Sequence, residues 1–404
     1  MKIEYLKSLI QSCNINFLIG SGLSKPYLDT LGDIEKWLTD LDKEKEDIDE
    51  QIYNIIKASI FKVYFDNVIY PNVKREIRKR KADFDVTIKN YKELLLHLNN
   101  IVLNRNNTLL TKQINLFTTN IDLFFEKSLE DTSLEFNDGF KGRLEPVFDL
   151  TNFQKSYSKT SLHYDNISEI PVFNLLKVHG SINWRQKGSK AITLFQEISQ
   201  NLKPIKDAID KIDTKYFIST DKTSKDEDVT LDVLLERAAL PATLEDISIN
   251  SYDDFFEEYE ELVIVNPTKA KFKETVLEEQ YYEMMRIYAN SLEKVNTLLF
   301  VMGFSFADEH IRSITIRAAN SNPTLQIIVF AYNDNARAEI LKNLGTFNNE
   351  NIIVLTPTLF VDNCGLDDEE KKKLRKRIDV FDCTTINSEI FSAISQIIKS
   401  IPKS

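Results

Sequence analysis

The sequence contains little cysteine and no long apolar run. Only Cys13, Cys364 and Cys383 occur among 404 residues, too far apart to form a CxxC pair or a four-cysteine zinc ribbon. We therefore expect free thiols in a reducing compartment, and no metal site. No stretch approaches the roughly 20 apolar residues that a membrane span needs, and the N-terminus lacks the apolar segment of a signal peptide. These absences predict a cytoplasmic protein with no membrane partner.

The charge balance is acidic. Asp and Glu number 62 against 51 Lys and Arg, so the formal net charge is -11. Such a mean field repels nucleic acid and disfavours direct nucleic-acid binding. Two basic clusters are exceptions, KREIRKRK at 74–81 and KKKLRKR at 371–377. The second follows DDEE, an order of charges that complements a helix dipole. We interpret both clusters as helix ends or protein-contact faces.

Short β-branched runs alternate with helical patterns along the chain. The runs are Asn16–Gly20, Ile114–Asn120, Val172–His179, Leu262–Pro267, Thr297–Gly303, Leu325–Ala331 and Ile352–Leu355, and the helical patterns include Lys273–Leu292, Asp308–Ala319 and Ala336–Asn343. Continuous apolar runs of this kind are typical of strands covered on both faces. The alternation predicts an α/β fold with a Rossmann-like, doubly wound parallel sheet. Its ligand crevice is expected at the carboxyl ends of the strands.

Two charged segments interrupt this alternation. Residues 38–110 are rich in Lys, Glu, Asp and Asn and carry apolar residues at helical spacing, which predicts a helical insertion after the first βα turn. Residues 186–260 combine a predicted helix at Leu202–Lys211 with a polar tract, which predicts a second, mixed and mostly helical insertion. The sheet domain is then expected to comprise residues 1–37, 111–185 and 261–404.

A glycine-bearing loop follows the first run, in FLIGSGLSKPY at 17–27. Gly20 and Gly22 permit close backbone approach, and the amides that follow can face a phosphate at a helix start. The dinucleotide-dehydrogenase fingerprint GxGxxG requires a third glycine where Lys25 stands. The loop therefore favours a dinucleotide site but lacks the fingerprint of hydride transfer.

The second run ends in TTNID, with Asn120 and Asp122 two residues apart. In extended backbone this spacing directs both side chains toward one cleft. An amide can orient a water molecule or a ribose hydroxyl, and a carboxylate can anchor its neighbours. A turn and N-cap before the helix predicted over Leu123–Leu129 is an equally good explanation of the same residues.

The third run ends in VHGS, which puts His179 where the ligand crevice is expected. Imidazole has an unperturbed pKa of about 6.5 and exchanges protons near neutral pH. The other histidines have structural explanations: His97 lies in a leucine-rich helix, His163 in a polar loop and His310 at a helix start. His179 is therefore the candidate general base, although a histidine at a strand end is often only structural.

A fourth motif, GFSFADEHI at 303–311, turns from a strand into a helix. Gly303 and Ser305 can contact a ribose or a phosphate at the sheet edge. Asp308 and Glu309 form a favourable helix start in their own right, so a simple capped turn explains the motif as well.

In chain order, GSGLS at 20–24, TTNID at 118–122, VHGS at 178–181 and GFSF at 303–306 resemble the SIR2-like (sirtuin) NAD-binding domain. The resemblance implies that NAD is the substrate. It implies catalytic roles for Asn120 and Asp122 beside the nicotinamide ribose and for His179 as general base. It implies NAD contacts from Gly20, Ser21, Gly22, Leu23, Ser24, Thr119, Gly303, Phe304, Ser305 and Asn333.

The sequence differs from sirtuin deacylases in two places. A four-cysteine zinc module usually follows the HG motif of those enzymes, and this chain has an acidic segment there. A GIPDFR-type segment usually follows the glycine loop, and residues 25–33 here read KPYLDTLGD. Both differences weaken the case for acyl-lysine recognition.

Other motifs resemble bacterial SIR2-like domains of antiphage defence, namely NDGFKG at 137–142, HGSINW at 179–184, NPTKAKF at 266–272 and GFSFADEHI. This resemblance implies NAD+ hydrolysis to nicotinamide and ADP-ribose, which depletes NAD in the infected cell. It also implies a homo-oligomer and, as for some members, a HerA-type hexameric ATPase as partner. A protein deacylase, an ADP-ribosyltransferase and a non-catalytic NAD-sensing scaffold stay open as alternatives.

Overall fold

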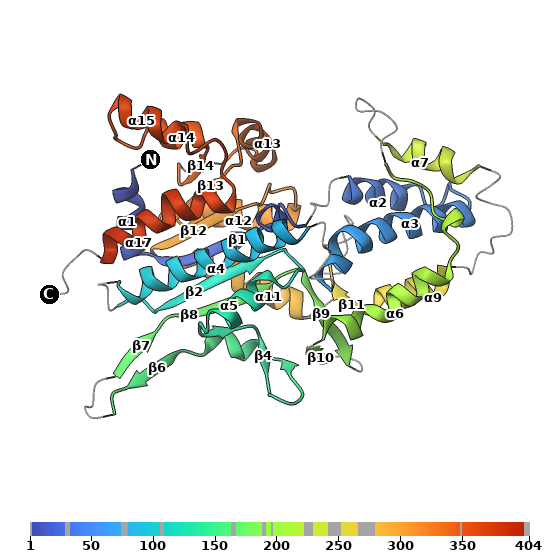
Figure 1. Ribbon diagram of the computed structural model, residues 1–404, viewed down its shortest axis with the longest axis horizontal. Helices are drawn as coiled ribbons and strands as arrows, with labels where there is room; N and C mark the ends of the chain where they lie inside the picture. Colours follow the sequence, from blue (N-terminus) through green and yellow to red (C-terminus); the bar gives the residue numbers. More distant parts are fainter. Residues whose placement is uncertain are drawn as a thin grey trace.

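The protein folds into two lobes, one built on a large sheet and one built from helices (Figure 1). The computed structural model describes residues 2–28, 33–73, 80–105, 109–162, 167–187, 191–194, 197–221, 229–240, 252–265, 279–347 and 350–399.

The larger lobe contains a parallel sheet of seven strands in the order β14-β13-β12-β1-β2-β8-β3. Their bounds are β1 Asn14–Ile19, β2 Gln113–Thr118, β3 Phe136–Asn137, β8 Val172–Lys177, β12 Thr297–Met302, β13 Leu325–Phe330 and β14 Ile352–Leu355. Every predicted run except Leu262–Pro267 forms a strand of this sheet. The prediction of an α/β fold with a parallel sheet flanked by helices is confirmed.

Alternate residues of the central strands face opposite helical layers. In β12, Leu298 and Phe300 pack into the core on one face, whereas Leu299 and Val301 pack into the core on the other. The first layer contains α1 (Ile3–Ser12), α4 (Lys81–Leu103), α5 (Phe124–Asp131), α14 (Pro357–Asp362), α15 (Asp368–Arg375), α16 (Cys383–Ile386), η7 (Asn387–Phe391) and α17 (Ser392–Lys399). The second contains α11 (Glu279–Glu293), α12 (Glu309–Ser321) and α13 (Asp334–Leu344). Burial on both faces explains the continuous apolar runs.

A row of asparagine side chains crosses four neighbouring strands. Asn16, Asn115, Asn174 and Asn137 lie opposite one another on β1, β2, β8 and β3. Asn115 Nδ2 donates to Asn16 Oδ1 at 2.8 Å, and Asn174 Nδ2 donates to Asn115 Oδ1 at 2.8 Å. Asn137 Nδ2 donates in turn to Asn174 Oδ1 at 2.9 Å. Because a one-residue slip would turn an amide to the other face and leave its partners unpaired, this row specifies the strand register.

The smaller lobe combines helices from both predicted insertions (Figure 1). The first contributes α2 (Ile34–Lys43), α3 (Glu50–Tyr64), η2 (Phe65–Ile69) and η3 (Tyr70–Asn72), and the second contributes α6 (Ile198–Lys211), η5 (Thr214–Tyr216), α7 (Leu231–Ala238) and α9 (Asp253–Glu260). These helices share one apolar core, in which the Phe61 ring stacks on Tyr259 at 4.5 Å between centroids. Segments far apart in sequence therefore form one packing unit.

Helix α4 falls within the predicted first insertion, 38–110, but packs on the sheet. Its buried residues Leu94, Leu95 and Leu98 belong to the core of the first helical layer. The predicted insertion is therefore divided between the two lobes. Its amphipathic pattern indicates a buried face without indicating what covers that face.

The expectation that Leu262–Pro267 joins the parallel sheet is wrong. Its described part is β11 (Leu262–Ile264), which pairs antiparallel with β9 (Gly180–Lys187), and Pro267 lies outside the described residues. This second sheet has the order β11-β9-β10-β5-β4. Its other strands are β10 Ala191–Leu194, β5 Val147–Phe148 and β4 Phe140–Lys141. The remaining described elements of this region are η4 (Leu150–Gln154) and the hairpin of β6 (Tyr157–Thr160) and β7 (Ile167–Ile170). A short apolar run carries no periodicity that distinguishes these two settings.

The basic cluster at 371–377 covers the end of α15. Asp367 and Glu370 form a capping box at the start of the helix, and basic residues occupy its last turn. The helix-end interpretation is confirmed for this cluster, whereas most of the cluster at 74–81 lies outside the described residues. Within the described part of the chain, none of the helices combines the length and the apolarity that crossing a bilayer requires.

Candidate active site

The parallel strands bring the predicted motifs to one edge of the sheet. From β1 the chain continues to β2 and β8 on one side, and it later builds β12, β13 and β14 on the other. The strand order therefore reverses beside β1, and open α/β sheets bind ligands in the crevice at such a switch point. Gly20 follows β1, Asn120 follows β2, His179 follows β8 and Gly303 follows β12.

The glycine loop after β1 packs against the loop after β12. Gly22 N donates to Gly303 O at 3.0 Å, and a Cβ on Gly20 would lie 2.4 Å from that same oxygen. Gly303 has φ +63°, and its Cβ would lie 2.4 Å from Leu23 N. The close backbone approach predicted for these glycines therefore occurs within the protein, between the loop after β1 and the loop after β12. Ser21 is half-buried and Gly22 is exposed at the surface of this contact.

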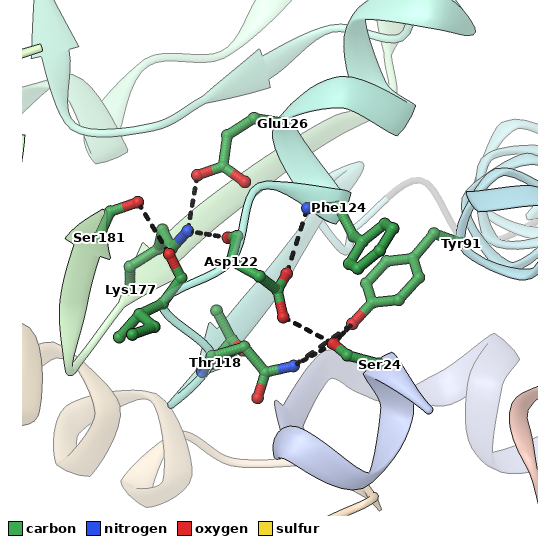
Figure 2. A network of polar contacts seen from close by, with 10 residues as sticks. Ser24, Tyr91, Thr118, Asp122, Phe124, Glu126, Lys177 and Ser181 are labelled. Carbon is green, nitrogen blue, oxygen red and sulfur yellow. Dashed lines mark hydrogen bonds and ion pairs between the residues drawn. The ribbon is translucent and has the colours of Figure 1, made fainter. Parts of the chain in front are cut away.

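Ser24 joins the glycine loop to the motif after β2 (Figure 2). Its hydroxyl donates to Asp122 Oδ2 at 2.6 Å, while Asn120 Nδ2 donates to Ser24 Oγ at 3.2 Å. Asn120 and Asp122, predicted to face one cleft, thus contact the same hydroxyl. Tyr91 of α4 brings its own hydroxyl to 2.9 Å from Ser24 Oγ. All four side chains are buried, with at most 6% of the surface exposed.

The donor and the acceptor of each hydrogen bond to Ser24 can be assigned. Because the Ser24 proton goes to Asp122, Ser24 Oγ accepts from the Tyr91 hydroxyl and from Asn120 Nδ2. Asn120 Nδ2 also lies 3.3 Å from the Tyr91 hydroxyl. The network therefore uses the amide nitrogen of Asn120. The amide oxygen, Oδ1, is buried and has no hydrogen-bond partner among the described residues.

Asp122 has two further supports. Its Oδ1 accepts from Phe124 N at 3.2 Å, so the predicted turn before α5 is also present. Lys177, the last residue of β8, donates to the Asp122 carbonyl and pairs with Glu126 at 2.8 Å, with 3% of its side chain exposed (Figure 2). Burial raises the pKa of Asp122 and of Glu126, and the Lys177 charge opposes both shifts. A buried ion pair therefore holds the backbone of the motif.

His179 projects from a fixed turn. Val265 N donates to the His179 carbonyl at 2.9 Å. Gly180 has φ +74°, and a Cβ there would lie 2.0 Å from Val263 O, so the HG pair requires its glycine. The imidazole Nε2 lies 3.1 Å from Asp308 Oδ2, with 15% of the His179 side chain exposed. A partly accessible imidazole paired with a carboxylate is suited to proton transfer.

The other predicted NAD contacts follow β2, β12 and β13 at the same edge of the sheet. Thr119, Phe304, Ser305 and Asn333 are half-buried. Asn333 Oδ1 caps α13 by accepting from Ala336 N at 2.9 Å, and the Ser305 carbonyl accepts from Asn343 Nδ2 at 3.0 Å. Both residues therefore have structural partners, and the Ser305 contact is made by its carbonyl and not by its hydroxyl. His163 and the NPTKAKF segment at 266–272 lie outside the described residues.

The sequence reasoning missed the residues that support the site from a distance. Tyr91 lies in a helix assigned to an insertion, Lys177 directly precedes the VHGS motif, and Glu126 lies in the helix that follows TTNID. Asp308 was noticed only as a helix start. A buried charged residue inside an apolar run, such as Lys177 in NLLKVHG, is the one local signal that sequence reasoning could have used.

The described residues contain no group of three or more His, Cys, Asp or Glu side chains arranged to hold a metal ion. Two hollows lie elsewhere on the surface. One of about 700 Å³ lies along the outer face of α12, beside Arg312 and Arg317, and one of about 420 Å³ lies at the edge strand β14. Neither is lined by Ser24, Asn120 or His179.

No protein-family model matches this sequence, and no curated protein is significantly similar to it.

Proposed function

We propose that the protein is an NAD+ hydrolase that cleaves the bond between nicotinamide and ribose. The observation that carries the proposal is Asn120 Oδ1, a buried acceptor without a partner among the described residues, beside the switch point of the sheet. A ribose hydroxyl or a water molecule bound there would supply the missing donor. The resemblance of four ordered motifs to SIR2-like domains supports the same substrate.

The walls of the crevice also suit a dinucleotide. Gly22 and Gly303 are both exposed, so backbone without side chains forms this part of the surface. Such a surface allows close approach by a phosphate or a ribose. The half-buried hydroxyls of Ser21 and Ser305 lie on the same loops and offer polar contacts.

The proposed reaction assigns a separate role to each polar group. Nicotinamide leaves with the electron pair of its bond to ribose C1′, and positive charge develops on the ribose. Asn120 Oδ1 orients the attacking water or the ribose, and Asp122 holds Asn120 through Ser24. His179 accepts a proton from the water as its oxygen bonds to C1′. The products are nicotinamide, ADP-ribose and one proton.

Nicotinamide release by the purified protein tests this proposal. We expect NAD+ to be converted to equal amounts of nicotinamide and ADP-ribose without any added peptide. Asn120→Ala and His179→Ala should each reduce the rate by at least about 100-fold, because each removes a group acting on the reacting atoms. His97→Ala, in α4, is the matched histidine control and should keep the wild-type rate. Wild-type turnover by either site variant, with folding verified by melting temperature, would contradict the assignment.

The same assay separates the alternative functions. Nicotinamide release that depends on an acyl-lysine peptide indicates a deacylase, and transfer of labelled ADP-ribose to protein indicates an ADP-ribosyltransferase. Binding of NAD+ with no release under any condition indicates a sensor.

We further propose that this activity serves antiphage defence by depleting NAD, in a homo-oligomer that assembles with a HerA-type ATPase. The motif resemblance alone supports this context. The assay should therefore be repeated with any ATPase encoded beside the gene, with particle mass measured in parallel. An unchanged mass and an unchanged rate in the mixture would argue against that partner.

A further inference from the structure

Asp308 uses its two carboxylate oxygens for different purposes. Oδ1 accepts from His310 N at 3.0 Å and from Ile311 N at 3.1 Å, which makes Asp308 the N-cap of α12. Oδ2 lies 3.1 Å from His179 Nε2. One oxygen therefore fixes the carboxylate to a helix end while the other meets the candidate base.

Asp308 is the N-cap of a helix, α12, that is firmly packed. The helix spans Glu309–Ser321, and its buried face packs against the sheet. Thr315 in this helix lies 2.7 Å from the hydroxyl of Tyr288 in α11, which ties the two helices together. A negative charge at a helix N-terminus is also favoured by the helix dipole. Asp308 is consequently held in place independently of His179.

The backbone of His179 is fixed, but its ring needs an orienting partner. Rotation about the side-chain bonds would move both ring nitrogens, and only a contact from another element can select one orientation. Asp308 provides that contact from 129 residues away. Its side chain is 12% exposed, so solvent screens the interaction only partly.

The contact also selects the tautomer. A carboxylate only accepts hydrogen bonds, so the neutral imidazole carries its proton on Nε2 and leaves Nδ1 without one. His310 lies nearby, and burial lowers its pKa, which keeps it uncharged near neutral pH. The negative charge of Asp308 is therefore not neutralised by this second histidine.

We infer that Asp308 is a positioning residue that orients His179 and keeps its Nδ1 free to accept a proton. This inference rests on the proposed function. In the hydrolytic step, the proton of the attacking water moves to Nδ1, and the water oxygen bonds to ribose C1′ as nicotinamide leaves with its electron pair. Asp308 stabilises the resulting imidazolium through the carboxylate oxygen that faces Nε2.

Asp308→Asn tests the inference because asparagine is a good N-cap and keeps the shape of the side chain. We expect kcat for NAD+ to fall roughly 10- to 1,000-fold while KM changes by less than about twofold, since the change affects proton transfer and not binding. Asp49→Asn is the matched control. Asp49 caps α3 through Gln51 N and Ile52 N in the same manner and lies in the helical lobe.

A second measurement does not depend on turnover. Nitrogen-15 NMR of histidine-labelled protein should show His179 as the Nε2-protonated tautomer in the wild type and in Asp49→Asn. The Asp308→Asn variant should lose that single tautomer. A variant with wild-type kcat, or with an unchanged His179 tautomer, would overturn the inference. If wild-type protein releases no nicotinamide, the proposed hydrolase function fails, while the NMR result still decides whether Asp308 orients His179.

Discussion

Two polar clusters flank the candidate crevice, and they are built in opposite ways. Ser24, Asn120, Asp122 and Tyr91 form a hydrogen-bonded network whose side chains are at most 6% exposed. His179 Nε2 and Asp308 Oδ2 lie 3.1 Å apart, with 15% and 12% of the two side chains exposed. The first cluster holds its members in one arrangement, whereas the second keeps a titratable group within reach of solvent.

This difference in burial indicates that the first cluster contributes mainly to stability and the second mainly to proton transfer. A buried network contributes to folding because each unpaired member would leave its partners unsatisfied. A single contact of a partly exposed histidine contributes less to folding than a buried network, and a base must be accessible to exchange its proton. Substitutions in the network should therefore lower the free energy of unfolding, in addition to any loss of rate where Asn120 itself is changed, and those at the His179–Asp308 pair should mainly lower the rate.

The largest expected effect on stability comes from Lys177→Met. Removing the lysine, which is 3% exposed, leaves the largely buried Glu126 without its ion-pair partner and the Asp122 carbonyl without its donor, at a cost of about 3–5 kcal/mol. The control is Lys92→Met, which breaks a pair with Asp131 whose side chains are 34% and 33% exposed. That loss should stay below about 1 kcal/mol. Urea unfolding measures the loss of unfolding free energy in both variants. Equal losses would contradict the claim that the Lys177–Glu126 pair supports the backbone of the TTNID motif.

Gly303→Ala should have the next largest effect. The new Cβ would lie 2.4 Å from Leu23 N, so the two loops must separate. Gly345→Ala is the control, because Gly345 has φ +67° and nothing within 4 Å of its Cβ position. The backbone conformation alone should cost about 1–2 kcal/mol in the control. We expect the Gly303 variant to lose at least about 1 kcal/mol more and to bind NAD+ more weakly. Thermal unfolding that ranks the variants in the opposite order would refute the loop contact.

Tyr91→Phe should have the smallest effect on stability. The new ring keeps the contacts with Phe124 and Phe125, whose centroids lie 5.3 Å and 4.8 Å away. Loss of the hydroxyl should cost about 1 kcal/mol. Because the hydroxyl helps to hold Asn120, we expect the KM for NAD+ to rise more than kcat falls. Steady-state kinetics of Tyr91→Phe and Asp308→Asn, measured together, compare the KM effect expected for the first variant with the kcat effect expected for the second. If Tyr91→Phe lowered kcat alone, the proposed difference between the two clusters would be wrong.

The sequence predicted the central sheet well because its strands are buried on both faces. Residues 298–302 form a continuous apolar run, and Val172–Lys177 has only Asn174 and its final lysine as polar residues. The run at Leu262 was misassigned, since three or four apolar residues fit an antiparallel edge as easily. The placement of α4 also lay beyond local reasoning, because an amphipathic helix does not identify the surface that it covers.

The same limit applies to the candidate site. Asn120 and Asp122 could be placed together because two residues on one extended segment share a side. Tyr91 and Asp308 could not, since their contacts with Ser24 and His179 span 67 and 129 residues. Each also has a complete local explanation, as a helix residue and as an N-cap.

The sequence by itself determined the alternation of strands and helices, and with it the edge where Gly20, Asn120, His179 and Gly303 arrive. These features follow from periodicity and chain order, which are local properties. Only the tertiary structure decided that Asn120 Oδ1 has no partner among the described residues and that Asp308 faces His179. Those facts depend on hydrogen bonds between separate elements, and packing selects such bonds after the local structure has formed.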